Sequence, residues 1–471
     1  MTLKARIRAI DRFIKGCRED GIYDDLNACC VMAGWSNLAG ALTPLVGAAP
    51  TNSNITVYDR GVGAVFNGTS STLDLNRAVS SDDKDDCHAA MYHSALGADA
   101  RGVYFSHTAD TTTGALSLRP LSDTAPPTLQ GRFRSNEIKS LTATGGAGFT
   151  GGSRASAAVA TYRWNDDSED IESASASGTL GNYRLGRYYT TYSAGVVGFY
   201  SAGSATDLAL LDARVSTLMA DLRAIEEAGF DRDALAYLRA VEEADNAFLE
   251  TSVKVAVNNL VSGLKADGLW DAIGSTCLLC GPRTLAGALV PLKGDAPTSY
   301  GFVEGDFDRV GLTGDGTSYL DSNRAVDADE DSSHHISAFV ETGSGVLGQY
   351  AIGAMSTSST YTIAGGGMYS RSNTSNAALT SATLGIVGVS RSSPANFNWK
   401  RSGGATATSV TAATPANISV SHLVFAYNTN TATPSGFSTS ALAFYSIGSS
   451  IDLAKLDSHV SAYVTAIGAA I

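Results

Sequence analysis

The sequence is poor in charge and lacks long apolar runs. Only 17% of its residues are charged, and 33 Lys and Arg face 46 Asp and Glu, which gives a net charge of −13. A chain this acidic, without a basic patch, is not expected to bind nucleic acid. No apolar run reaches the roughly 18 residues of a membrane span, so membrane insertion is not expected.

Cysteine is also scarce. The six cysteines are Cys17, Cys29, Cys30, Cys87, Cys277 and Cys280. The N-terminal stretch carries charges inside its apolar pattern and lacks a signal-peptide core, so we expect synthesis and folding in a cytoplasm, without a disulfide framework. Cys277 and Cys280 have CxxC spacing, but no second CxxC follows. We interpret them as buried helical thiols; redox or metal use is the alternative.

What the chain does have is a repeat. Residues 199–216 read FYSAGSATDLALLDARVS and residues 444–461 read FYSIGSSIDLAKLDSHVS, with twelve of eighteen positions identical. In each copy a short apolar run ends at a Gly-Ser turn, and an aspartate, Asp207 or Asp452, follows where a helix N-cap belongs. Apolar residues spaced three and four apart come next, so each copy predicts a strand, a turn and an amphipathic helix.

The repeat defines the domain organisation. A chain of 471 residues is too long for one hydrophobic core. We predict a first helix-plus-β-sandwich unit over residues 1–225, a helical linker over 226–249 and a second helix-plus-β-sandwich unit over 250–471. The linker is rich in Ala, Leu, Glu and Arg, and a helical linker is stiffer than a Gly/Ser-rich one.

Each unit is expected to begin with helices. Residues 3–32 follow a helical pattern broken at Gly21, and the second copy repeats the pattern with its break at Gly268. A connector follows at residues 38–51 and 285–298, with eleven of fourteen positions identical. Its prolines and glycines exclude a continuous helix, so we predict an extended, partly buried segment.

Beyond the connector, the apolar pattern changes to a period of two. Gly- and Ser-punctuated runs recur at intervals of about ten residues, which is typical of an antiparallel β-sandwich. The expected strands include residues 89–92, 102–106, 115–118, 157–164 and 184–189, and in the second unit 335–340, 349–355, 384–390, 396–400 and 422–427. The predicted fold class is mainly β with helices, as two tandem antiparallel β-sandwich units.

One acidic cluster invites a catalytic interpretation. Residues 166–172 read DDSEDIE. Glycosidases use two carboxyl groups, one on each side of the glycosidic bond, to catalyse its hydrolysis. Sandwich-fold glycosidases carry an alternating ExDxE pattern, which this cluster does not fit. The matching segment of the second unit, residues 400–403, has no carboxylate. A solvated hairpin is therefore favoured over a catalytic pair, and no residue is assigned as catalytic.

Oxygen-bearing side chains recur beside a predicted turn. Asp74 with Asn76, and Asp321 with Asn323, could hold Ca²⁺ or could brace the turn through bonds to the backbone. We favour the braced turn, and we assign no residue to a metal or a cofactor.

Histidines and arginines also recur. His88 in the first unit and His334–His335 in the second flank equivalent strands, without ligand partners at metal-binding spacing. Arg154 and Arg391 follow a serine in both units, and no histidine base is near, so a structural arginine is favoured over catalysis.

A resemblance to a known family rests on longer segments. Residues 268–298, 311–324, 390–393 and 444–467 (GLWDAIGSTCLLCGPRTLAGALVPLKGDAPT, GLTGDGTSYLDSNR, SRSS and FYSIGSSIDLAKLDSHVSAYVTAI) resemble uncharacterised phage and prophage virion proteins. The resemblance covers residues 250–471 and is weaker in the first unit. It implies a concanavalin A-like, or laminin G-like, jelly roll and a structural or adhesive role, and it carries no catalytic residues.

The leading expectation is a non-enzymatic bacteriophage protein on the surface of the virion: a fibre, collar or head-decoration component, assembled in the host cytoplasm. Other virion proteins would be its partners, and it would form a trimer or a dimer. The alternative is a carbohydrate-binding module that contacts host surface glycans; a glycan-degrading enzyme is a weaker alternative. Candidate glycan-contact aromatics are Tyr162, Trp164, Tyr188 and Trp399, and core packing is the other interpretation of these residues.

Overall fold

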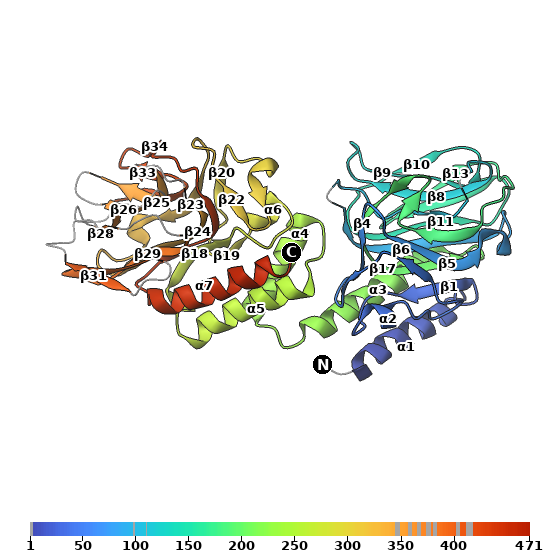
Figure 1. The fold of residues 1–471 in the computed structure, drawn as a ribbon, viewed down its shortest axis with the longest axis horizontal. Helices are drawn as coiled ribbons and strands as arrows, with labels where there is room; N and C mark the ends of the chain where they lie inside the picture. The colour runs from blue at the N-terminus through green and yellow to red at the C-terminus, as the bar shows by residue number, and fades with distance from the viewer. Residues whose placement is uncertain are drawn as a thin grey trace. The chain divides into compact units, whose positions relative to one another are not determined.

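The computed structural model describes residues 3–97, 99–109, 111–343, 349–356, 360–364, 369–373, 378–379, 384–401, 406–410 and 418–471. The chain divides into two compact units (Figure 1). The first comprises residues 1–229 and 246–251, and the second comprises residues 230–245 and 252–471. Within the described part of the chain, no helix has both the length and the hydropathy of a membrane span.

The first unit contains two antiparallel sheets. The inner sheet has the order β13 (Asp167–Glu172), β12 (Val159–Trp164), β11 (Gly148–Arg154), β6 (Cys87–Leu96), β17 (Ala194–Gly203), β4 (Gly63–Asn67) and β3 (Val57–Asp59), and β1 (Leu26–Val31) also pairs with β17. The outer sheet has the order β10 (Lys139–Thr142), β9 (Thr128–Ser135), β8 (Ala115–Leu121), β7 (Phe105–His107), β14 (Asn182–Leu185), β5 (Thr72–Ala78) and β2 (Thr51–Ser53). A small hairpin joins β15 (Arg187–Tyr188) to β16 (Thr191–Tyr192).

Helices form a third layer of this unit. Side chains from both sheets meet in one buried core, while α1 (Leu3–Glu19) and α3 (Leu208–Glu227) pack on the other face of the inner sheet. Because the inner sheet is covered on both faces, strands such as β6 and β11 are buried along almost their whole length rather than at alternate residues. The connector was predicted to be extended throughout, but it begins with a short helix, α2 (Leu38–Ala41).

The second unit repeats this order of elements. Its inner sheet runs β19 (Pro291–Lys293), β18 (Ile273–Leu278), β35 (Ala441–Gly448), β24 (His334–Thr342), β29 (Gly385–Ser393), β30 (Asn396–Arg401) and β31 (Ala407–Val410), with β22 (Gly311–Thr313) on β35 and β21 (Phe307–Asp308) on β22. Its outer sheet runs β20 (Thr298–Tyr300), β23 (Tyr319–Ala325), β32 (Ser421–Val424), β25 (Tyr350–Met355), β26 (Thr360–Ala364), β27 (Tyr369–Ser372) and β28 (Ala378–Leu379), with β33 (Tyr427–Thr429) and β34 (Pro434–Ser435) beside it. Among the strands that the structure describes here, pairing is antiparallel except between β25 and β33, which are parallel.

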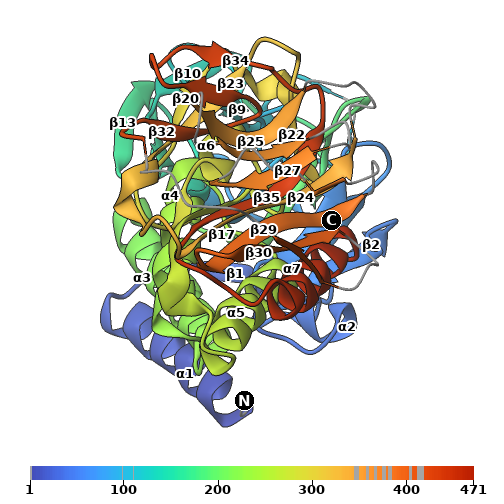
Figure 2. The same ribbon diagram turned by 90° about the vertical axis from the view of Figure 1, so that its left-hand side faces the viewer.

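Helices α5 (Thr251–Ala266) and α7 (Leu453–Gly468) lie side by side against the inner sheet of the second unit (Figures 1 and 2). A short helix, α6 (Leu285–Ala288), again comes from the connector. The expected fold class, mainly β with helices and two antiparallel sandwich units, is therefore confirmed.

Helix α4 (Arg232–Asp245) belongs to the second unit, whereas the sequence suggested a separate linker over residues 226–249. A nearly buried ion pair joins Glu242 to Lys254 of α5, with Nζ 2.7 Å from Oε1. The Asp245 carboxylate accepts bonds from the backbone N–H groups of Arg283 and Thr284 at 2.8 and 2.9 Å. These contacts attach α4 to its own sandwich.

Two helical predictions are wrong. Residues 26–31 and 273–278 form strands β1 and β18, not the second arm of a helical hairpin. Each pairs with the last strand of its unit, β17 or β35. The thiols of Cys29, Cys30 and Cys277 are accordingly buried on strands rather than on helices.

The apolar stripe of α3 is buried, as the repeat predicts. Leu211 and Val215 are fully buried, and Asp207 caps the helix by accepting bonds from the N–H groups of Ala209 and Leu210 at 2.8 and 3.1 Å. We expect Leu211→Ala to lower the free energy of unfolding of the first unit by about 2–5 kcal/mol, the range for a core leucine. Urea denaturation tests this, and a loss near zero would show that the stripe does not stabilise the unit.

Candidate functional site

Two of the four candidate aromatics are core residues. Tyr162 and Trp164 lie on β12 with 0% of their surface exposed, and both belong to the core between the sheets of the first unit. The indole N–H of Trp164 donates to the carbonyl of Gly146 at 3.1 Å. Because alternate residues of β12 point toward the opposite sheet, neither ring reaches the surface, and neither is a glycan-contact residue.

The other two candidates are half-buried. Trp399 lies on β30 and packs against the core of the second unit. Tyr188 lies on the β15–β16 hairpin of the first unit, and its hydroxyl accepts a bond from Nη1 of Arg132 at 2.8 Å. Tyr188 lies in a group of polar and aromatic side chains. The structure does not bring the four candidates together.

A second group of aromatics was not predicted from the sequence. The second unit has five half-buried or exposed rings in two groups of contacts, and we name the five together the aromatic strip: Tyr300, Tyr319 and Phe437 in one group, and Tyr427 and Tyr350 in the other. Tyr300 is 45% exposed and stacks on Tyr319 with ring centroids 4.6 Å apart and planes 9° apart. Phe437 lies 6.0 Å from Tyr319.

The aromatic strip lies on the outer sheet of the second unit. Tyr300 of β20 and Tyr319 of β23 face each other in register, and Tyr319 alternates with the buried Leu320. Tyr350 and Tyr427 meet edge to face at 5.0 Å, and Gly436 fits between them, where a Cβ would come within 2.7 Å of both rings. The rings are therefore ordered by the sheet and by one another.

Asp321, beside the aromatic strip, braces a turn. Its Oδ1 accepts a bond from the N–H of Asn323 at 2.9 Å, and Asp74 binds Asn76 in the same way at 2.8 Å in the first unit. Asn76 and Asn323 have φ angles of 51° and 53°, so each pair braces a left-handed turn. Among the described residues, no cluster of three or more His, Cys, Asp or Glu could hold a metal ion. The braced-turn interpretation is confirmed.

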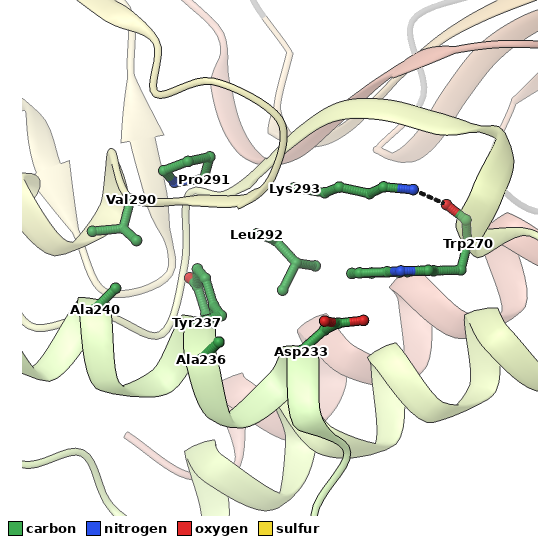
Figure 3. A pocket seen from close by; sticks show the side chains of 9 residues that line it. All are labelled: Asp233, Ala236, Tyr237, Ala240, Trp270, Val290, Pro291, Leu292 and Lys293. Atoms are coloured by element: carbon green, nitrogen blue, oxygen red, sulfur yellow. Dashed lines mark hydrogen bonds between the residues drawn. The ribbon is translucent and has the colours of Figure 1, made fainter.

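A cleft of about 370 Å³ opens in the second unit between α4, β19 and the turn η2 (Trp270–Ala272) (Figure 3). A second cavity, of about 400 Å³, shares Asp233 and Trp270 with it. The ammonium groups of Lys265 and Lys293 lie 5.3 and 5.1 Å from the centroid of the Trp270 ring. Lys265 also pairs with Asp233 at 2.6 Å, and Lys293 donates to the backbone carbonyl of Trp270 at 2.6 Å.

Lys265 is thus paired with a carboxylate, and Lys293 is bound to the carbonyl and the ring of Trp270. The equivalent pair in the first unit, Arg18 over the ring of Tyr23 at 4.6 Å, shows that a cation over this aromatic position is part of the repeated architecture. We therefore assign Trp270 and its lysines a structural role in closing the helix layer.

The acidic cluster and the recurring histidines lie in contrasting surroundings. Strand β13, with the acidic cluster, is an edge strand whose carboxylates are mostly exposed, as expected for a solvated hairpin. His88 and His335 are fully buried, and each ring bonds a backbone carbonyl and a serine hydroxyl. Burial lowers the pKa of both to about 4, so they are neutral near neutral pH.

The positions of the cysteines do not favour thiol reactivity. All six are buried and unpaired with one another as disulfides. Burial raises the pKa of Cys277 and Cys280 to about 12, which removes the thiolate that redox or metal chemistry needs. The buried-thiol interpretation of the CxxC spacing is favoured by this geometry.

No protein-family model matches the chain, and no curated protein matches it. Solved structures give distant matches. Domain 4 of AbnA, a GH43 extracellular arabinanase from Geobacillus stearothermophilus in complex with arabinotriose, is 11% identical, covering 40% of this chain and 98% of that one at a TM-score of 0.26. The binding domain of botulinum neurotoxin serotype D is 8% identical, covering 90% and 96% at 0.32. The binding domain of botulinum neurotoxin DC in complex with rat synaptotagmin II is 9% identical, covering 92% and 97% at 0.30. Scores this low do not indicate what this chain binds.

Proposed function

We propose that this protein is a non-enzymatic adhesive protein that binds surface glycans through the aromatic strip of its second unit. The observation that carries this proposal is the exposed, stacked pair of Tyr300 and Tyr319 on the outer sheet. A tyrosine ring offers an apolar face to the C–H face of a sugar, and its hydroxyl bonds the sugar's hydroxyls.

Preorganisation supports the same function. The rings are held by strand pairing and by mutual contact, so little side-chain freedom remains to be lost when a ligand binds. The carboxylate of Asp321 lies on the same face of β23 as Tyr319 and adds an acceptor for sugar hydroxyls. Contiguous exposed aromatics on a sheet face are also costly to leave in water unless they serve an interaction.

The location and assembly of the protein are part of this proposal. The resemblance to phage virion proteins supports a place on the virion surface, with other virion proteins as partners. A trimer or dimer would present several aromatic strips at once, and such multivalency strengthens weak glycan contacts without new interactions. Receptor adhesion and a structural role on the particle are compatible in one protein.

Alanine substitution of the stacked pair tests the proposal. We expect the wild-type chain to bind at least one neutral polysaccharide in affinity electrophoresis, and Tyr300→Ala to weaken it about fivefold, the equivalent of about 1 kcal/mol for a lost ring contact. Leu384→Ala is the matched control, because Leu384 is an exposed apolar residue outside the aromatic strip. Failure of the wild type to bind across a broad panel, or equal binding by a Tyr300→Ala, Tyr319→Ala double variant, would rule the proposal out.

A further inference from the structure

The outer sheet of the first unit carries a different surface, which we name the arginine–tyrosine face: Arg119, Arg132, Arg187, Tyr188, Tyr189 and Tyr192. Arg119 on β8 alternates with the buried Leu118, and Arg132 on β9 alternates with the buried Phe133, so both side chains project from the outside of the sheet. Tyr188 on the β15–β16 hairpin lies between them.

Direct contacts hold these side chains in place. The guanidinium of Arg119 lies 5.0 Å from the centroid of the Tyr188 ring, and Nη1 of Arg132 donates to the Tyr188 hydroxyl at 2.8 Å. Tyr188 also meets Tyr189 edge to face at 5.2 Å. Arg187 lies 5.3 Å from the ring of Tyr192. All six side chains are half-buried, so the positive charges are fixed at the surface.

Their charges are not neutralised. Most other arginines at the surface of the first unit pair with a carboxylate, for example Arg101 with Asp123 at 2.7 Å and Arg214 with Asp20 at 2.7 Å. Arg119, Arg132 and Arg187 take part in no ion pair of the described residues, and Arg119 donates instead to the neutral side chain of Gln130. Three uncompensated arginines in a chain with 46 acidic residues make a local positive potential that an anion would satisfy.

We propose that the arginine–tyrosine face binds an acidic polysaccharide, with its carboxylate or phosphate groups on the guanidinium groups and its sugar rings on the tyrosines. Arginine suits such anions because its planar fork donates two parallel hydrogen bonds. Tyrosine rings supply the apolar faces that sugars need and that a simple ion does not. The net charge of −13 disfavours a long, densely charged nucleic acid by comparison.

The proposal is independent of the aromatic strip, because it concerns other residues in the other unit. The aromatic strip contains no arginine, so the two units would bind different sugars: the second unit a neutral one and the first an acidic one. The repeated architecture would then support two specificities in one chain.

Binding to polygalacturonate, with dextran as the neutral comparison and a poly(glycerol phosphate) polymer as the phosphate-bearing one, tests the inference. We expect the full chain to bind at least one of the two anionic polymers, and an Arg119→Gln, Arg132→Gln double variant to lose roughly tenfold in affinity. Tyr188→Phe keeps the ring but removes the acceptor of Arg132, so we expect a smaller loss. Raising the salt concentration should weaken binding.

Two control variants show whether the unpaired arginines of this face are responsible for the binding. Arg101→Gln removes an arginine of the same unit whose charge is already paired, and it should bind as the wild type does. Tyr300→Ala should also leave binding to the anionic polymer unchanged, which distinguishes the inference from the function proposed above. Equal losses in Arg101→Gln, no binding to either anionic polymer, or tighter binding of duplex DNA than of both polymers would overturn it.

Discussion

Lowering the pH from about 7 to about 5 is expected to destabilise both units by several kcal/mol, because buried neutral histidines must take up protons when the chain unfolds. Burial lowers the pKa of five histidines to about 3 or about 4: His88 and His93 in the first unit, and His334, His335 and His422 in the second. The folded state therefore binds fewer protons than the unfolded state throughout this range.

The direction of the change in the free energy of unfolding follows from these pKa values. An unfolded histidine protonates near its ordinary pKa of about 6.5, whereas the folded one does so only near 4 or below, so the stabilisation is fully present above about pH 6.5 and is lost as the pH falls toward the folded value. Each histidine contributes a loss of about 2 kcal/mol at about pH 5. The first unit should lose about 4 and the second about 6 kcal/mol.

Urea titrations at several pH values, followed by circular dichroism, provide the measurement. Substituting His335→Gln, which keeps a donor for the carbonyl of Ser449, should reduce the pH dependence of the second unit by about 2 kcal/mol between about pH 7 and about pH 5. Burial raises the pKa of Asp25 and Asp212 in the first unit and of Asp245 and Glu341 in the second, so proton uptake by these carboxylates in the folded state offsets part of the loss. A urea midpoint that stays constant from neutral pH to pH 5 would contradict the prediction.

Replacement of a buried arginine should be the most damaging single substitution. Arg391 is fully buried, and its guanidinium donates to the backbone carbonyls of Ser372, Asn373 and Pro394 at 2.6, 2.9 and 2.6 Å, while Nε donates to Ser393 at 3.0 Å. We expect Arg391→Met to lower the free energy of unfolding of the second unit by about 3–5 kcal/mol, since the buried carbonyls lose their charged donor.

Arg154 offers the same test in the first unit. It is also fully buried and donates to the carbonyls of Phe133 and Ser173 at 3.0 and 2.8 Å. Arg154→Met should cost as much, whereas Arg119→Gln on the outer sheet should change stability by no more than about 0.5 kcal/mol. Urea denaturation of each variant measures these changes in the free energy of unfolding. A loss below about 1 kcal/mol at either buried site would show that the carbonyls find other donors.

The recurrence of a Ser-Arg dipeptide in both units thus marked a structural residue, as the sequence indicated. The Asp207 and Asp452 caps were equally predictable, because a helix start has a local chemical signature. Strand β11 was not predicted. Its residues Gly151 and Gly152 have low strand propensity, yet a Cβ on Gly152 would lie 2.5 Å from the ring of Phe133 on the facing sheet, so this position requires glycine.

Strands β1 and β18 were predicted wrongly in another way, because the sequence suggested helices where the structure has strands. Each is a short apolar run that fits a helix as well as a strand, and only its pairing with β17 or β35 decides the outcome. The aromatic strip could not be predicted for a related reason. It gathers residues from positions 300 to 437 through strand pairing and a loop, and no local pattern places Tyr300 or Phe437 beside Tyr319.

The pairing of β1 with β17, and of β18 with β35, joins the beginning of each unit to its end. The inner sheet of each unit cannot form completely until the last strand, β17 or β35, has been synthesised. Before that, β6 or β24 has one edge without a partner strand. The same closure makes each unit self-contained. A unit closed in this way can recur in tandem, and the matching segments at residues 199–216 and 444–461 indicate that this one does.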